Sequence, residues 1–410
     1  PDVMTTTYCG DQNDGRAVSP VFSLLLRLLS ANWTWGRLTL VLPDGRRHQL
    51  TGQTPGKAAI LNIRDPRFAA RVLKSGDIGF AEGYMAGEWD TPDLALLLET
   101  LVNNYENIRR LFDGNPLMNL VHWVGHRLNR NTRRGSRRNI HAHYDLGNAF
   151  YGAWLDPSMT YSSARFETAG QGLQDAQRAK YASLARIMDL RPGHRVLEIG
   201  CGWGGFAEFA AREIGAMVTG VTISGEQHDY ARRRLFEAGL AERADIRLID
   251  YRDVEGRFDR VASIEMFEAV GREYWPTYFQ KLHDVLTPDG RAGLQIITIQ
   301  DELFDEYDAR TDFIQKYVFP GGCLPSEARM APDISSAGLV EAGIVRFGGD
   351  YAETLAEWTR RFESAWGEIV RTEASFDERF RRLWRFYLAY CEAGFRSGRT
   401  DVIQMALQRA

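Results

Sequence analysis

Four glycines cluster where an apolar run gives way to a helical pattern. Residues 196–205 read Val-Leu-Glu-Ile-Gly-Cys-Gly-Trp-Gly-Gly, and a helical pattern follows them, which predicts a strand, a tight turn and the start of a helix. Glycine permits positive φ and a close backbone approach, and a helix N-terminus offers unpaired amides. The turn therefore predicts a nucleotide pocket, although its glycine spacing does not meet the six-residue dinucleotide fingerprint.

Two acidic residues narrow the choice of ligand. Glu198 precedes the turn, and Asp250 ends a later strand. Negative charge at these places suits a cationic amino-acid nucleoside better than a pyrophosphate. S-adenosylmethionine (SAM) is such a ligand, and the alternative is a strand–helix connection without a ligand.

The elements around the turn alternate between helix and strand. Such alternation predicts a doubly wound, parallel α/β sheet, whose ligands lie at the carboxyl ends of the strands. The predicted strands are Arg195–Ile199, Met217–Ile223, Ile246–Ile249, Phe258–Ile264 and Arg291–Ile297, and the predicted helices are Gln174–Met188, Gly225–Ala238 and Glu273–Leu286.

A smaller α+β domain, associated with lipid or membrane, is expected ahead of this sheet, in residues 1–125. Its apolar helix at Val21–Leu29 either packs on a core or rests on lipid. Pro43-Asp44-Gly45 stands between two apolar runs and predicts a β-hairpin. The hairpin strands are expected at Arg37–Leu42 and Arg46–Leu50, and further helices at Pro66–Ser75 and Asp93–Tyr105.

A basic linker is expected in residues 126–142. Its arginines are Arg127, Arg130, Arg133, Arg134, Arg137 and Arg138. Small polar neighbours indicate a solvated tether, and the alternative is attraction to anionic lipid headgroups, for which Trp123 would suit an interface.

Composition excludes several classes of protein. At 410 residues the chain is long enough for two or three domains, and a net charge of −4 does not indicate a nucleic-acid partner. The four cysteines lack Cys-x-x-Cys spacing, so neither a metal site nor a disulfide scaffold is expected, and a reducing cytoplasm fits. The chain has no 18-residue apolar run and no signal pattern at its start, which predicts neither a transmembrane helix nor secretion.

Seven motifs in register resemble the cyclopropane-fatty-acyl-phospholipid synthase family of SAM-dependent methyltransferases. The resemblance runs from about His143 to Arg396 and implies a class I, Rossmann-like methyltransferase domain in residues 143–410, with insertions that bind an acyl chain. Besides the glycine turn, the motifs are His-Tyr-Asp-Leu-Gly-Asn at 143–148, Leu-Asp-Pro-Ser-Met-Thr-Tyr-Ser at 155–162, Gly-Val-Thr-Ile-Ser-Gly-Glu-Gln at 220–227, Asp-Tyr-Arg-Asp at 250–253, Met-Phe-Glu-Ala-Val-Gly at 266–271 and Lys-Tyr-Val-Phe-Pro-Gly-Gly-Cys-Leu-Pro at 316–325.

The resemblance implies a set of SAM contacts at the strand ends. Hydroxyl and amide groups there suit the polar groups of SAM, and Tyr251 offers a flat face to adenine. Ser224 is interpreted instead as the N-cap of the next helix. The implied contacts are Tyr161, Ser162, Gly200, Cys201, Gly202, Thr222, Gln227, Tyr251 and Arg252.

The resemblance also implies the catalytic residues. In the resembling enzymes an alkene carbon attacks the SAM methyl group, and a bound bicarbonate takes a proton from the resulting cation. The implied bicarbonate ligands are Glu268, Ile297 and Tyr351, together with Ser163 at a cysteine position and Gln295 at a histidine position.

Gln295 is the chemically important departure from the family pattern. Glutamine can donate a hydrogen bond to an anion but cannot carry positive charge or shuttle a proton as imidazole can. The cation could therefore lose its proton from a chain carbon and leave a methyl branch. The alternative is that the neighbourhood compensates and a cyclopropane still forms.

Aromatic side chains are expected near the acyl-chain cavity, with plain core packing as the alternative for most of them. These residues are Phe267, Tyr274, Trp275, Tyr278, Tyr317 and Phe319.

The sequence thus predicts SAM-dependent methyl or methylene transfer to a double bond in an acyl chain of a membrane phospholipid. The alternatives are methylation of a small soluble acceptor and a catalytically silent protein that binds SAM or lipid. The resemblance further implies a homodimer, and we expect peripheral contact with the inner face of the cytoplasmic membrane.

Overall fold

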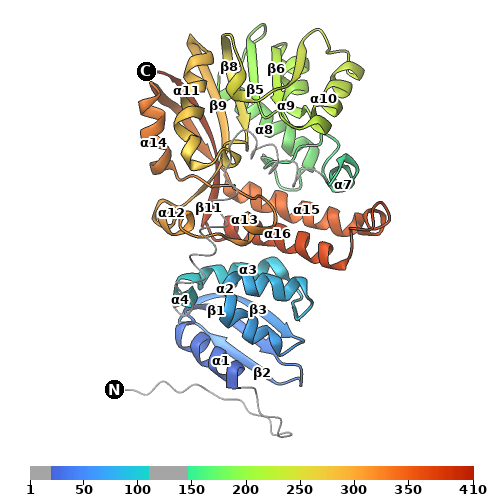
Figure 1. The fold of residues 1–410 in the computed structure, drawn as a ribbon, viewed down its shortest axis with the longest axis vertical. Helices are drawn as coiled ribbons and strands as arrows, with labels where there is room; N and C mark the ends of the chain where they lie inside the picture. The colour runs from blue at the N-terminus through green and yellow to red at the C-terminus, as the bar shows by residue number, and fades with distance from the viewer. Residues whose placement is uncertain (1–19, 110–145) are drawn as a thin grey trace.

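The computed structural model describes residues 20–109 and 146–410, which form two sheets with their helices. A four-stranded sheet has the order β2-β1-β3-β4, and a seven-stranded sheet has the order β10-β11-β9-β8-β5-β6-β7. The two sheets lie at opposite ends of the molecule (Figure 1). The predicted domain boundaries and the whole basic linker, with Trp123, fall in residues outside the described ranges or beside their ends.

The N-terminal α+β unit, residues 20–109, confirms the predicted helix and hairpin. β1 pairs antiparallel with β2, and alternate residues of β1 are buried, as a half-buried strand requires. β3 pairs parallel with β1 and was not predicted from the sequence. Its first residues are exposed and include Pro55 and Gly56, so they lack the pattern of a strand. The elements are α1 Pro20–Asn32, β1 Trp35–Val41, β2 Arg47–Thr51, β3 Thr54–Ile63, α2 Arg67–Met85, β4 Trp89–Asp90, α3 Leu94–Asn103 and α4 Tyr105–Arg109.

The larger sheet confirms the doubly wound α/β prediction in its central part. Strands β5 to β9 are parallel and lie within a few residues of their predicted positions. They are β5 Arg195–Ile199, β6 Met217–Thr222, β7 Ala244–Leu248, β8 Phe258–Ile264 and β9 Leu286–Ile299.

Two antiparallel strands complete this sheet, so it is mixed and not wholly parallel. β11 (Thr400–Arg409) pairs antiparallel with β9, and β10 (Leu339–Arg346) pairs antiparallel with β11. The six residues 402–407 of β11 are all buried because β11 lies inside the sheet. Periodicity cannot distinguish such a continuous buried run from a buried helical segment, which is why the sequence did not indicate β11.

Helices cover both faces of the larger sheet and one of its ends. The longer ones are α8 Leu173–Ile187, α10 Gly225–Glu237, α11 Trp275–Val285, α14 Glu327–Ser336, α15 Gly348–Ile369 and α16 Glu378–Arg396. The shorter ones are α7 Asn148–Trp154, α9 Gly205–Phe209, the π-helix η1 Ala210–Ile214, the 3₁₀ turns η2 Tyr251–Asp253, η3 Phe267–Ala269 and η4 Arg272–Tyr274, and α12 Asp301–Asp308 and α13 Phe313–Tyr317.

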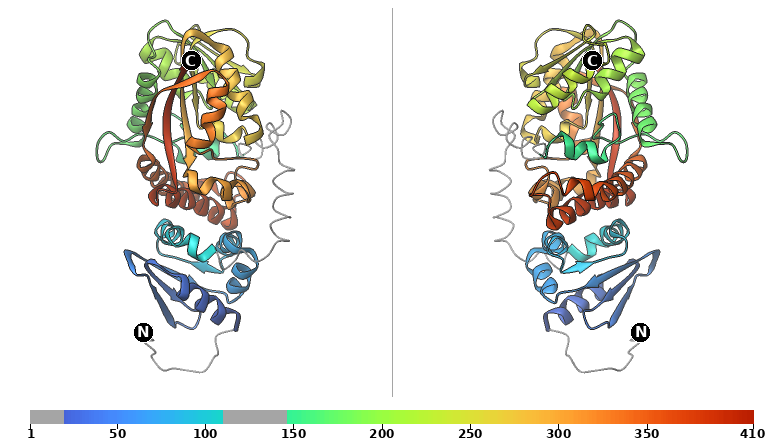
Figure 2. Two further views of the ribbon diagram at one scale, coloured as in Figure 1. Left: turned by 90° about the vertical axis from the view of Figure 1, so that its left-hand side faces the viewer. Right: turned by 90° about the vertical axis from the view of Figure 1, so that its right-hand side faces the viewer.

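Helices α15 and α16 lie between the sheet and the N-terminal α+β unit (Figures 1 and 2). Arg382 of α16 reaches across this contact and donates hydrogen bonds to the backbone oxygens of Tyr84 and Trp89, the latter at 2.9 Å. Its guanidinium also lies 4.0 Å from the centre of the Tyr84 ring. Because Arg382 is only 8% exposed, this contact fixes α16 against the N-terminal unit.

Among the described residues, none of the helices is both long enough and apolar enough to span a bilayer.

Candidate active site

One cavity of about 690 Å³ joins the carboxyl ends of the parallel strands to the interior of the N-terminal α+β unit. At the sheet it is lined by the glycine turn after β5 and by residues that follow β6, β7 and β8. At its other end it is lined by side chains of α1, β1, β3, α2 and α3. Ligands of doubly wound sheets bind at the first of these places, so the cavity holds the candidate active site.

The glycine turn presents open backbone to the cavity. Gly200 and Gly202 have φ of +73° and +54°, a conformation that favours glycine. The amides of Gly200 and Cys201 donate to the carbonyl of Val221 at 2.9 and 3.0 Å, which fixes the turn against β6. A Cβ atom added to Gly202 would meet nothing within 4 Å, so space for a ligand lies directly over the turn.

Glu198 carries a buried acceptor at the same place. Its side chain is 2% exposed and lines the cavity, and its Oε2 atom has no hydrogen-bond partner. Burial raises the pKa of this carboxyl well above its ordinary value, and the nearby charges of Lys180 and Arg234 oppose that rise. A cationic ligand beside Glu198 would supply the missing partner.

All nine residues predicted to contact SAM line this cavity. Gln227 accepts a hydrogen bond from the Thr222 hydroxyl at 3.1 Å, and Ser224 caps α10, as the sequence indicated. Arg252 forms a bidentate ion pair with Asp250, with distances of 2.9 and 2.7 Å. The bare turn, the unpartnered Glu198 oxygen and these polar strand ends fit SAM.

The five predicted catalytic residues meet around two glutamates. Glu265, the first residue after β8, accepts hydrogen bonds from the backbone amide of Ser163 and the side-chain amide of Gln295, both at 2.7 Å. The Tyr351 hydroxyl donates to the other oxygen of the same carboxyl group. Glu265 lines the cavity, whereas Ser163 and Gln295 lie behind it.

A buried polar network holds Gln295 in this orientation. Gln404, its register partner on β11, donates to the Gln295 side-chain oxygen at 3.1 Å and so turns the amide nitrogen toward Glu265. Ser183 in turn donates to Gln404 at 2.6 Å. Gln295 and Gln404 are fully buried, and a buried amide with both ends satisfied has one stable orientation.

Lys180 supplies the positive charge of this network. Its Nζ atom donates to the Ser162 hydroxyl at 2.6 Å and to the Ser163 carbonyl at 3.0 Å. Burial lowers the pKa of Lys180 to about 8, and the charge of Glu265 is the largest opposing cause. Lys180 thus remains protonated at neutral pH.

The second glutamate, Glu268, is held by backbone groups. Its Oε1 atom accepts from the amide of Ile297 at 2.5 Å, and its backbone oxygen accepts from the amide of Cys323 at 2.8 Å. Its Oε2 atom is buried without a partner, and the residue lines the cavity. Burial, followed by the charge of Glu265, raises the pKa of Glu268 to about 8, so this carboxyl keeps its proton at neutral pH.

These contacts decide whether the predicted bicarbonate fits. The amides of Ser163 and Gln295 and the Tyr351 hydroxyl donate to Glu265, and the amide of Ile297 donates to Glu268. These four donors are therefore engaged by protein carboxyl groups. They are not free to bind a further anion, so these residues do not fit bicarbonate.

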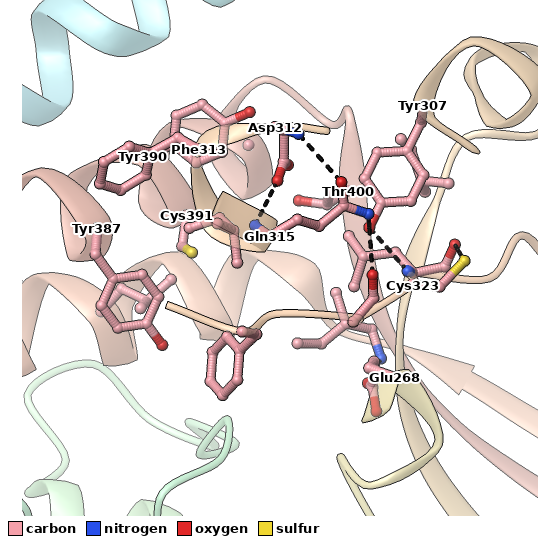
Figure 3. Close-up of a pocket in the computed structure, with 18 of the residues that line it drawn as sticks. Glu268, Tyr307, Asp312, Phe313, Gln315, Cys323, Tyr387, Tyr390, Cys391 and Thr400 are labelled. Carbon is pink, nitrogen blue, oxygen red and sulfur yellow. Dashed lines mark hydrogen bonds between the residues drawn. The ribbon is translucent and has the colours of Figure 1, made fainter. Parts of the chain in front are cut away.

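The segment after β9 lines the cavity, and Figure 3 shows Asp312, Phe313, Gln315 and Cys323 of this segment. α13 begins with a capping box in which Asp312 and Gln315 exchange hydrogen bonds of 2.8 and 3.1 Å. The Gln315 side chain also donates to the carbonyl of Gly322 at 2.9 Å. The Phe-Pro-Gly-Gly motif is thereby folded back onto Glu268 through Cys323.

Of the six aromatic residues expected at the cavity, only Phe319 lines it. The Phe267 ring instead packs against Trp275 and Tyr278, with ring centroids about 5 Å apart. This is the alternative of plain core packing. Much of the aromatic lining comes from an element that the resemblance did not single out, because the second half of α16 faces the cavity. The lining residues of α16 include Phe386, Tyr387, Tyr390 and Phe395.

Three residues of the site were missed at the level of sequence. Glu265 directly follows a correctly predicted strand, and strand ends are where ligands bind, so its position was a usable signal. Lys180 is one of several charges on an amphipathic helix, and Gln404 belongs to a strand that was not predicted. Neither residue has a sequence pattern that indicates the network.

Comparisons with known proteins agree with this geometry. The family model described as mycolic acid cyclopropane synthetase matches residues 131–405. The chain belongs to this family. It is 40% identical over 399 residues to a tuberculostearic acid methyltransferase of Mycobacterium tuberculosis, covering 93% of this chain and 90% of the relative.

Two further relatives support the same assignment. A cyclopropane-fatty-acyl-phospholipid synthase of Escherichia coli is 34% identical over 380 residues, covering 92% of this chain and 94% of the relative. A crystal structure of a mycolic acid cyclopropane synthase with SAH and CTAB has a TM-score of 0.62 and 29% identity, covering 67% of this chain and 98% of that one. The chain is accordingly a SAM-dependent methyltransferase of class I fold.

Proposed function

We propose that this methyltransferase transfers the methyl group of SAM to a double bond in an unsaturated acyl chain of a membrane phospholipid. The observation that carries the proposal is the single cavity that joins the glycine turn and the two glutamates to an apolar compartment. A small soluble acceptor would leave that compartment without a use.

The apolar compartment lies inside the N-terminal α+β unit. Its lining is aliphatic or aromatic almost throughout, and it includes Phe22, Leu25, Leu38, Leu61, Phe68, Val72, Leu98 and Leu101. Burial of an acyl chain against such side chains contributes about 0.8 kcal/mol per CH₂ group. This gain supports an acyl substrate over a polar one.

The polar end of the cavity provides the charges that the reaction needs. SAM supplies an electrophilic methyl group when it is bound. Transfer to an alkene leaves a cation on the chain, and the Glu265 carboxylate lies in the cavity to stabilise it. The aromatic rings of α16 line the same cavity and add cation–π attraction.

Two products are compatible with this chemistry, a cyclopropane and a methylated chain. The names of the relatives support both, since one is a methyltransferase and the other a cyclopropane synthase. Peripheral contact with the inner face of the cytoplasmic membrane and assembly into a homodimer remain predictions of this proposal.

Mass spectrometry of lipids from a host that expresses the chain tests the proposal. We expect monounsaturated acyl chains to gain the mass of one methylene group, and we expect no gain with the Gly202→Val variant. Fragmentation then distinguishes a ring from a branch. An unchanged acyl profile at matched expression, with added methyl groups in a soluble acceptor, would refute the proposal.

A further inference from the structure

Glu265 holds the place that the family resemblance assigns to a bound bicarbonate. Three of the predicted anion donors converge on its carboxyl group: the Ser163 amide, the Gln295 amide and the Tyr351 hydroxyl. The carboxylate has the same planar pair of oxygens that bicarbonate would present to these donors. The side chain is partly buried and borders the cavity, where a bound anion would meet the substrate.

The backbone at Glu265 is in a conformation that the fold alone would give to glycine. Its φ is +49°, in the left-handed region, and it is one of three non-glycine residues with positive φ in the described part of the chain. Such a conformation disfavours an L side chain. A strained residue held by three hydrogen bonds inside a cavity indicates a functional side chain.

The surroundings give this carboxyl group more charge-stabilising contacts than its neighbour has. Burial raises the pKa of Glu265, but Lys180, Tyr351, Ser163 and Gln295 all lower it. Glu268 has no such set of donors and is protonated at neutral pH. Of the two carboxyl groups, the one with the larger set of donors is the one suited to act as a base.

We propose that Glu265 is the proton acceptor of this enzyme, so that its turnover needs no bicarbonate. This inference rests on the proposed function, because it assigns the base for methyl transfer to a double bond. It explains why Gln295 suffices where the family pattern has histidine: a glutamine that only orients a fixed carboxylate needs no charge of its own.

The proton and electron pairs balance without a further reagent. The π pair of the double bond forms the new carbon–carbon bond, and the pair of the broken carbon–sulfur bond stays on sulfur. Glu265 then accepts one proton, either from the new methyl group or from a chain carbon next to the cation, and becomes a carboxylic acid. The released pair closes a ring if the proton leaves the new methyl group, or forms a double bond if the proton leaves the chain. The acid then returns its proton to solvent once the product has left.

The test compares Glu265→Gly with Glu265→Gln in buffer stripped of carbon dioxide. Glycine tolerates the positive φ and frees the three donors around Glu265 for a small anion, whereas glutamine keeps the shape of the side chain and removes its charge. With monounsaturated phosphatidylglycerol vesicles and SAM, we expect both variants to lose about 100-fold in turnover. Added bicarbonate or formate should restore about tenfold in Glu265→Gly and nothing in Glu265→Gln, while wild-type turnover stays the same with and without bicarbonate.

A binding measurement keeps this test independent of activity. We expect ¹³C-formate and ¹³C-bicarbonate resonances to broaden with Glu265→Gly in the presence of SAH and to remain sharp with the wild type. Wild-type turnover that falls in stripped buffer and returns with bicarbonate would overturn the inference, as would near-normal turnover of Glu265→Gln. If the wild type transfers no methyl group to the lipid, the proposed function is refuted. The resonance experiment would still decide whether Glu265 occupies the anion site.

Discussion

The two ends of the cavity are built in opposite ways. At the sheet, each oxygen of Glu265 has a donor, and Gln295, Gln404 and Ser183 form a chain in which each side chain orients the next. In the N-terminal α+β unit the lining consists mainly of leucine, isoleucine, valine and phenylalanine, which offer no directional contact.

This difference indicates that the two ends of the cavity have different roles. A buried hydrogen-bonded charge is sensitive to one lost donor, because the group left behind stays desolvated. Apolar burial is non-directional and proportional to area, so a chain can slide or vary in length at small cost. The polar end therefore fixes the reacting atoms, and the apolar end accepts a family of lipid chains.

Gly202→Val should have the largest effect, and only at the polar end. The valine side chain would occupy the open space over the turn and would strain a backbone at φ of +54°. We expect SAM affinity in calorimetry to fall about 100-fold, or about 2.7 kcal/mol.

Gly239→Val is the matched control, since Gly239 has a φ of +71°, open space around its Cβ position and no place in the cavity. It should bind SAM normally despite a similar backbone strain. Equal losses in both variants would mean that the turn binds no SAM.

Arg382→Leu should weaken the connection between the two ends. It removes two buried hydrogen bonds to the backbone of the N-terminal unit, at Tyr84 and Trp89. We expect the free energy of unfolding in urea to fall by about 2 kcal/mol. Arg379→Leu, at an exposed position of the same helix, should leave stability nearly unchanged, and equal stability of the two variants would show that α16 does not anchor the N-terminal unit.

Leu101→Trp should alter chain preference without altering SAM binding. Leu101 is half-buried on α3 and lines the apolar end, so a larger side chain shortens the space available there. We expect the ratio of turnover on long to short acyl chains to fall about tenfold, since one missing methylene group is worth a factor of that order. Asn103→Trp, exposed on the same helix, is the control, and an identical ratio in both variants would contradict an acyl chain in this compartment.

Glu268→Gln should give the smallest effect, on the pH dependence of stability. A carboxyl group whose folded pKa is raised keeps a proton that the unfolded chain loses, so it destabilises the fold as pH rises from its ordinary 4.5 to about 8. The melting temperature of the wild type should therefore fall relative to that of Glu268→Gln across this window. Parallel curves of melting temperature against pH would mean that Glu268 is ionised in the fold. Glu255→Gln, at an exposed position, is the control and should show the pH dependence of the wild type.

The polar end could be predicted from sequence as far as its backbone. Regular alternation placed β5 and β8 correctly, and the glycines located the turn, because both signals depend on local conformation. Seven of the nine residues predicted to contact SAM line the cavity for the same reason, because they lie at or after the ends of parallel strands. The other two, Tyr161 and Ser162, lie between α7 and α8 and were indicated by the resemblance alone.

The network behind Glu265 could not be predicted. Gln295 and Gln404 meet only because β11 enters the sheet antiparallel beside β9. They are separated by 109 in sequence number, and nothing in the sequence indicates that the two strands pair. The apolar end was missed likewise. Its lining combines the N-terminal unit with α16, and hydrophobic periodicity shows that a face is buried without showing what covers it.

The most direct measurement of the account follows the methyl group itself. Purified protein is incubated with SAM that carries a trideuterated methyl group and with monounsaturated phospholipid vesicles, and the acyl chains are then analysed by mass spectrometry. We predict that deuterium appears in the acyl chain in step with SAH release, with two deuterium atoms retained if the proton leaves the new methyl group and three if it leaves the chain. Release of SAH with deuterium only in a headgroup or a soluble acceptor would contradict the account.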